Sequence, residues 1–165
     1  MKYFYNFLLA IALVGCAATP GKVTQKEPVT PLDAPQKIAL DGYDATAYFT
    51  HAKPTRGSAQ FEVTWRGARW QFESATASVE FMRDPERYAP QYGGYCAYAT
   101  AHGFIARGDP EQWAIVDHKL YVNNNEFAMA LWDQDRAGHI VAADVNWPLI
   151  PKFPLPASGE LSRVQ

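Results

Sequence analysis

The stretch FEVTWRGARWQFE, residues 61–73, alternates apolar and polar side chains on both sides of a central Arg-Gly pair. Successive side chains of a β-strand point to opposite faces, so this period of two predicts two strands that each bury one face. The Arg66-Gly67 pair favours a tight turn between them, because glycine adopts positive φ without steric cost. We therefore predict a β-hairpin that places Trp65, Trp70 and Phe72 against the core.

Short helices are predicted around the strands. Residues 75–83 place Val79 and Met82 at helical spacing, and Asp84-Pro85 ends the segment because the residue before a proline disfavours helical geometry. A helix is predicted to begin at Asp109-Pro110. A second is predicted from Asn123 through Trp132, with Phe127 and Leu131 on one face. A last helix is predicted from Arg136 to Val145, with Ala137, Ile140 and Val141 packed against the core.

A second hairpin is predicted over residues 114–122, with its turn near Asp117-His118. Histidine tolerates positive φ better than most residues, so we assign His118 to the turn and not to a ligand set. The strands mix with short helices and lack the regular alternation of parallel α/β proteins. The sequence therefore predicts an α+β fold, a small antiparallel sheet built from hairpins with several short helices in one domain. We find no internal repeat in the sequence.

Length and charge limit the function classes. The chain has 165 residues, with 15 Lys and Arg against 17 Asp and Glu. This length suits one domain with its own core. Nucleic-acid binding requires clustered basic side chains, which the sequence lacks, so we expect no nucleic-acid partner.

The N-terminus resembles a bacterial lipoprotein signal. An apolar run over residues 3–14 is too short for a bilayer span of about 20 residues. It ends in Leu13-Val14-Gly15-Cys16, which is similar to the lipobox. The resemblance implies a signal peptide over 1–15, a lipid of the palmitate type on Cys16, and a membrane-anchored protein that faces the periplasm, with the outer membrane as the expected location. Export places the domain in an oxidising compartment.

Proline-rich segments flank the folded part of the chain. We predict a lipid-anchored flexible tether over 16–37, a domain over 38–148, and a Pro-rich tail over 149–165. A lipidated Cys16 would leave Cys96 without a disulfide partner, since the chain has only two cysteines.

Five sequence segments of the domain, given at the end of this paragraph in chain order, resemble the YHS-domain family. The similar members form a bacterial subgroup with a YGGYCAY segment and a terminal NWP. The resemblance covers 38–148 and implies a small domain that is not known, across the family, to be an enzyme. Some relatives are metal-associated and linked to copper-handling proteins. The segments are DGYDATAYF (41–49), WRGARWQFES (65–74), FMRDPERYAPQYGGYCAY (81–98), GDPEQWAIVDHKLYVN (108–123) and ADVNWP (143–148).

This chain departs from its metal-associated relatives at the cysteines that follow the first hairpin. Glu73 and Ala77 stand where those relatives carry cysteine. The soft-metal site of those relatives therefore does not transfer to this chain. The Tyr-His-Ser triplet that names the family is absent as well.

Cys96, inside YGGYCAY, has three readings that the sequence leaves open. It can be a small buried side chain among tyrosines, since free cysteine is often buried. It can bind copper or zinc together with His102, because thiolate and imidazole suit these metals, with Asp44 and His51 as further ligands. It can be the nucleophile or redox centre of an enzyme, with His102 as the base.

The function predicted from the sequence is thus a lipid-anchored envelope binding module for a transition metal or small ligand near Cys96. The alternatives are a thiol-dependent enzyme or redox protein, and a pure protein-interaction module in which Cys96 is structural. We read His139, in the last predicted helix, as structural.

Overall fold

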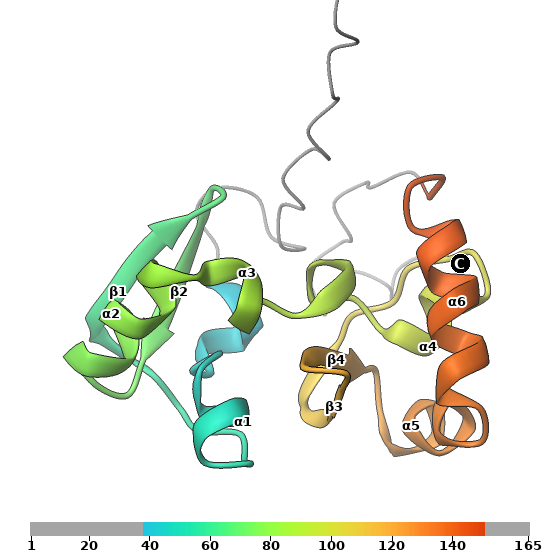
Figure 1. Cartoon of the computed structure of the whole chain (residues 1–165), viewed down its shortest axis with the longest axis horizontal. Helices are drawn as coiled ribbons and strands as arrows, with labels where there is room; N and C mark the ends of the chain where they lie inside the picture. The colour runs from blue at the N-terminus through green and yellow to red at the C-terminus, as the bar shows by residue number, and fades with distance from the viewer. Residues whose placement is uncertain (1–37, 151–165) are drawn as a thin grey trace, which may run out of the picture.

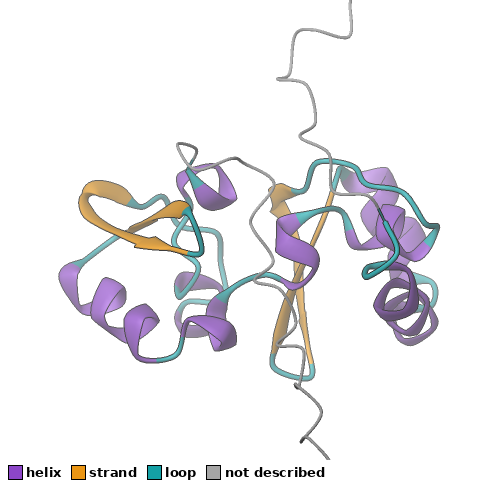
Figure 2. Cartoon of the chain, turned by 90° about the horizontal axis from the view of Figure 1, so that it is seen from above, coloured by secondary structure: helices purple, strands orange, loops and turns teal. Residues whose placement is uncertain are grey.

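The computed structural model describes residues 38–150 (Figure 1). The predicted signal peptide, the lipidation site Cys16, the tether over 16–37 and residues 151–165 of the predicted tail lie outside the described residues. The described part is an α+β domain with two antiparallel hairpins and several short helices, which confirms the predicted fold class. The hairpins do not join into one sheet, and each remains a separate two-stranded sheet (Figure 2).

The domain consists of two lobes that repeat one order of elements. The first lobe (residues 38–89) and the second lobe (residues 90–150) lie side by side (Figure 1). Each lobe runs 3-10 turn, short helix, strand, strand, helix, helix. The first lobe contains η1 (Ala39–Gly42), α1 (Ala47–Thr50), β1 (Ser58–Trp65), β2 (Ala68–Phe72), α2 (Ala75–Arg83) and α3 (Pro85–Tyr88), and the second contains η2 (Gln91–Gly94), α4 (Ala97–Ala101), β3 (Asp109–Val116), β4 (Lys119–Asn123), α5 (Glu126–Asp133) and α6 (Arg136–Asn146).

The two lobes also correspond in the residue pairs of their hairpins. Ser58 pairs with Phe72 and Asp109 pairs with Asn123, so each position recurs 51 residues later (109 − 58 and 123 − 72 both give 51). Both ladders are interrupted by a bulge directly after this pair. The two-residue turns also correspond, because both residues of each turn have positive φ, and the second turn contains His118 as predicted.

Helix caps recur at the same offset. The side chain of Ser74 accepts a hydrogen bond from the backbone N–H of the third residue of α2, and Asn125 does the same for α5. Asp84 and Asp135 cap α3 and α6 in the same way. The prediction that the chain has no internal repeat is therefore wrong. Capping needs only a short polar side chain, so Ser74 and Asn125 form the same cap although they are different residues.

The first hairpin matches its prediction. Trp70 and Phe72 are buried and Trp65 is half-buried, while Arg69 and Gln71 on the other face are also half-buried. The indole of Trp70 packs on the rings of Trp65 and Phe81, and its Nε1–H donates to the Trp65 carbonyl oxygen at 3.2 Å.

The predicted helix start at Asp109-Pro110 is wrong, because these residues begin strand β3. The Asp109 carboxylate accepts the backbone N–H of Glu111 at 2.9 Å, which is a local turn and not a helix cap. Pro110 lies where the ladder is interrupted, so its missing N–H breaks no strand pair. The helix predicted from Asn123 begins later, after the cap Asn125, because Asn123 is a buried part of β4.

Helical spacing was a poor guide to the buried face of the short helices. Five side chains that were expected to pack against the core lie on the surface. Ile140, which was also expected to pack, does contact the core of the second lobe. The apolar side chains that these helices bury are instead Ala77 and Phe81 in α2, Trp132 in α5 and Ala143 in α6. The exposed side chains are Val79, Met82, Phe127, Ala137 and Val141.

Each lobe has its own hydrophobic core. The first core gathers around Trp70, Phe72 and Phe81, and the second around Tyr121 and Trp132. The buried Ile150 shows that the folded part extends past the predicted boundary at 148.

Candidate functional site

Cys96 is buried and serves as a helix cap. Its side chain is 1% exposed, and its Sγ accepts the backbone N–H of Ala99 at 3.5 Å at the start of α4. The thiol also lies 3.5 Å from the Oδ1 of Asn123, the residue that ends β4. The same Oδ1 accepts the Tyr98 N–H at 3.0 Å. The thiol thus ties the start of α4 to the second hairpin, and its contacts are those of a structural side chain.

His102 lies at the other end of the same helix. Cys96 is the N-cap of α4 and His102 is its C-cap, so six residues of helical rise, about 9 Å, separate them. The His102 side chain is exposed, and its Nδ1 lies 2.8 Å from the Tyr98 carbonyl oxygen. The structure therefore does not bring Cys96 and His102 together as metal ligands or as a nucleophile and base.

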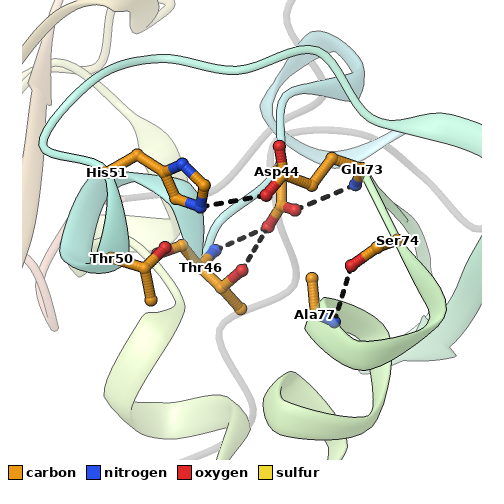
Figure 3. A network of polar contacts seen from close by, with 7 residues as sticks. All are labelled: Asp44, Thr46, Thr50, His51, Glu73, Ser74 and Ala77. Atoms are coloured by element: carbon orange, nitrogen blue, oxygen red, sulfur yellow. Dashed lines mark hydrogen bonds and ion pairs between the residues drawn. The ribbon is translucent and has the colours of Figure 1, made fainter.

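Asp44 and His51 lie in the first lobe, whereas Cys96 lies in the second, and both take part in a network of polar contacts (Figure 3). The buried Asp44 carboxylate accepts the N–H and Oγ1–H of Thr46 at 2.8 and 2.7 Å, and the Glu73 N–H at 2.9 Å. The Nε2 of His51 lies 3.0 Å from the Glu73 carboxylate. These bonds connect α1 to the end of β2, so both residues have structural partners.

Residues 38–150 contain no group of three or more His, Cys, Asp or Glu that is placed to hold a metal. The predicted set of Cys96, His102, Asp44 and His51 is split between two lobes. Asp44 and Cys96 occupy corresponding positions in the two lobes, because each directly follows a Gly-Tyr pair at the 3-10 turn. Each side chain accepts a backbone N–H near the start of the helix that follows.

A small pocket opens where the two 3-10 turns meet between the lobes. Its volume is about 30 Å³, which leaves room only for a very small molecule. Two charged residues, Asp41 and Arg107, and three glycines are among the residues that line it. Its remaining walls are apolar. The lining residues are Ala39, Leu40, Asp41, Trp70, Pro90, Gly93, Gly94, Arg107, Gly108 and Pro110.

Close backbone packing shapes the pocket. A Cβ on Gly108 would lie 2.2 Å from the Gly94 carbonyl oxygen, so no larger residue fits there without a shift of the backbone. The turns themselves depend on positive φ, at Leu40 and Asp41 in η1 and at Tyr92 and Gly93 in η2.

Two arginines converge on Asp41 at the pocket edge. Arg107 forms an ion pair with the Asp41 carboxylate, and Arg56 Nη1 donates to the Asp41 carbonyl oxygen at 2.8 Å. The side chains of Arg107 and Asp41 are 41% and 42% exposed, so solvent and small molecules reach this pair. Arg56 and Arg107 are equivalent residues of the two lobes, each the first of an Arg-Gly pair.

A second set of contacts between the lobes lies beside the pocket. Tyr43 donates its hydroxyl to the Glu111 carboxylate at 2.6 Å, and this bond is the main reason that the pKa of Tyr43 is raised. The Tyr48 hydroxyl donates to the Pro110 carbonyl oxygen at 3.1 Å, and its ring packs edge-on against Trp113. These contacts hold the two lobes around the pocket.

The sequence reasoning missed Asp41, Arg107 and the pocket itself. A signal was present: the two Arg-Gly pairs at 56–57 and 107–108 each follow a Gly-Tyr segment, at 42–43 and 94–95, by a similar interval. Comparing these intervals would have indicated both the duplication and the meeting of the two turns.

Comparison with family models, with curated proteins and with solved structures gives no match for this chain. The resemblance to YHS-domain proteins therefore rests on the sequence segments alone. Among residues 38–150, no helix has the length and apolar character needed to cross a membrane.

Proposed function

We propose that this chain is a cell-envelope lipoprotein, anchored through Cys16, whose YHS-type domain binds a small carboxylate in the pocket between its lobes. The observation that carries the proposal is the pairing of Arg107 with apolar walls in one accessible pocket. A guanidinium binds carboxylates through parallel N–H···O bonds, and apolar walls accept a short hydrocarbon part.

Asp41 does not prevent such binding. A guanidinium carries five N–H donors, and the ion pair with Asp41 occupies only part of them. Arg56, fixed by its bond to the Asp41 carbonyl oxygen, adds positive charge beside the pocket. The pocket's volume favours ligands of the size of formate or acetate.

Catalysis by Cys96 has little support in its surroundings. A catalytic thiol is an accessible thiolate beside a base, whereas this thiol is buried against an amide oxygen and a backbone N–H. A binding function is therefore favoured over a thiol-dependent enzyme or redox protein, and Cys96 is assigned a structural role.

The test compares small carboxylates with the matching neutral amides. Thermal unfolding of the full-length chain is followed with formate and acetate, and with the matching amides formamide and acetamide. A ligand at ten times its Kd stabilises by about 1.4 kcal/mol, which raises the Tm of a domain of this size by several degrees. We expect this shift with carboxylates and not with amides.

Two arginine variants locate the site. Arg107→Gln should abolish the shift. Arg136→Gln is the matched control, since Arg136 also forms a surface ion pair, with Asp133, at the same exposure of 42% and 41%. Equal shifts with carboxylates and amides, or equal shifts in the two variants, would contradict the proposed site.

A further inference from the structure

Two imidazoles lie close together on the surface where α4 meets α6. His102 follows α4 and His139 lies in α6, and their ring centres are 5.7 Å apart. The ring of Tyr98 contacts both, at 4.3 Å from His102 and 5.2 Å from His139. His102 is exposed and His139 is half-buried, so the pair is open to solvent.

The spacing suits one shared metal ion. A metal bound at about 2.0–2.1 Å from an imidazole nitrogen lies about 3.2 Å from the ring centre. Two such rings have centres about 5.2 Å apart at a tetrahedral angle and about 6.4 Å apart on opposite sides of the ion. The observed distance of 5.7 Å between the ring centres falls between these limits, and the ring planes are inclined by 42°.

The hydrogen bond of His102 leaves the required nitrogen available. Its Nδ1 lies 2.8 Å from the Tyr98 carbonyl oxygen, and a carbonyl can only accept, so Nδ1 carries the hydrogen. The lone pair is then on Nε2. This arrangement, in which one ring nitrogen donates to a backbone carbonyl, is the usual way that proteins fix the tautomer and orientation of a metal-binding histidine.

The two helices are held in place around the pair. The side-chain amide of Asn146, in α6, donates to the carbonyl oxygens of Thr100 and Ala101 at 3.3 and 2.9 Å. These are carbonyls at the end of α4, directly before His102. The bonds therefore fix the end of α4 against the helix that carries His139.

From this geometry we propose that His102 and His139 form a two-imidazole site for a divalent copper ion, with water in the remaining positions. Nitrogen donors with open positions suit Cu²⁺, which binds such sites more tightly than the other first-row divalent metals. The site is independent of the carboxylate pocket and of Cys96. It replaces the predicted ligand pair of Cys96 and His102 by a pair drawn from two elements that lie side by side (Figure 1).

The first test uses the unaltered full-length chain and Cu²⁺ alone. The chain has four histidines, so each ring gives a separate NMR signal. Substoichiometric Cu²⁺ should broaden the signals of His102 and His139 and spare those of His51 and His118, which lie in an ion pair with Glu73 and in a hairpin turn. Equal broadening of all four rings, or broadening that spares either His102 or His139, would overturn the proposal.

The second test measures Cu²⁺ affinity of variants by isothermal titration. His102→Asn and His139→Gln should each lower the affinity more than tenfold, because loss of even an outer-shell partner of a metal site costs about 10- to 100-fold. His118→Asn is the control, since asparagine also tolerates positive φ, and it should leave the affinity unchanged. An unchanged affinity in either of the first two variants, with thermal unfolding like that of the parent, would exclude the shared site. Failure of the carboxylate experiment would not affect this result.

Discussion

Substitutions of Cys96 distinguish a structural thiol from a reactive one. Cys96→Ala removes the buried sulfur and with it the acceptor of the Ala99 N–H. Cys96→Ser keeps an acceptor at the same place, and serine is a preferred N-cap residue, whereas alanine is a poor one. If the thiol is a structural cap, serine should therefore be tolerated better than alanine.

The structure gives the size of the effect. Loss of one buried heavy atom costs about 0.5–1.5 kcal/mol, and loss of a helix cap costs about 1 kcal/mol. We expect Cys96→Ala to lower the free energy of unfolding by about 2 kcal/mol. Asn123 does not add to this cost, because its Oδ1 still accepts the Tyr98 N–H. Cys96→Ser should cost less than about half as much, since its hydroxyl can also donate to Asn123 Oδ1.

Urea unfolding, followed by tryptophan fluorescence, measures both variants, and alkylation of the parent protein measures access to the thiol. The native thiol should react far more slowly than the thiol in urea, because its side chain is 1% exposed. A serine variant that is at least as unstable as the alanine variant, or a native thiol that reacts as fast as the unfolded one, would refute the structural role.

Three further predictions follow from other parts of the molecule. Trp70→Ala should lower the free energy of unfolding by about 3–5 kcal/mol. Thr64→Ala, at an exposed position of the neighbouring strand, should change it by no more than about 0.5 kcal/mol. Similar urea midpoints for the two variants would show that the buried face of the hairpin is misassigned. Alkaline pH should destabilise the fold, because burial raises the pKa of Tyr48, Tyr92 and Tyr121 in the folded state, for Tyr121 to about 12 against an unfolded value of 10.0. The folded state then favours the neutral phenols, so their contribution to the free energy of unfolding is complete below pH 10 and is lost as the pH rises towards 12. The loss is up to about 4 kcal/mol per pH unit for the three phenols together. A free energy of unfolding that stays constant from pH 9 to pH 11 would contradict this. Cys16→Ser should release the protein from membranes or leave the precursor unprocessed, and an intact mass of the membrane-extracted parent that begins at Met1 without lipid would exclude the anchor.

The hairpins could be predicted from the sequence because their signal is local. Alternation around Arg66-Gly67 is read from thirteen consecutive residues, and the Asp117-His118 turn requires only two residues that tolerate positive φ. The short helices were predicted with less success, since α2 buries Phe81 and α5 buries Trp132, while Met82 and Phe127 of the same two helices are exposed. With nine and eight residues, these helices have little more than two turns, which is too short for periodicity to define one face.

The candidate sites depend on contacts that no local pattern contains. Asp41 meets Arg107 across 66 positions of the chain, and His102 meets His139 through the packing of α4 on α6. The metal prediction paired Cys96 with His102 because they are near each other in the sequence. The intervening residues form a helix, and this helix keeps the two side chains at its opposite ends.

The central claim, that the pocket between the lobes binds a small carboxylate, is tested most directly by amide NMR of the full-length chain during titration with acetate. Gly93, Gly94 and Gly108 line the pocket, so their backbone N–H signals report on it. Gly138 lies in α6, outside the pocket, and its signal is the control. The account predicts saturable shifts of the three pocket glycines, none of Gly138, and loss of these shifts in Arg107→Gln. Shifts that are absent from the pocket glycines, or that persist unchanged in Arg107→Gln, would contradict it.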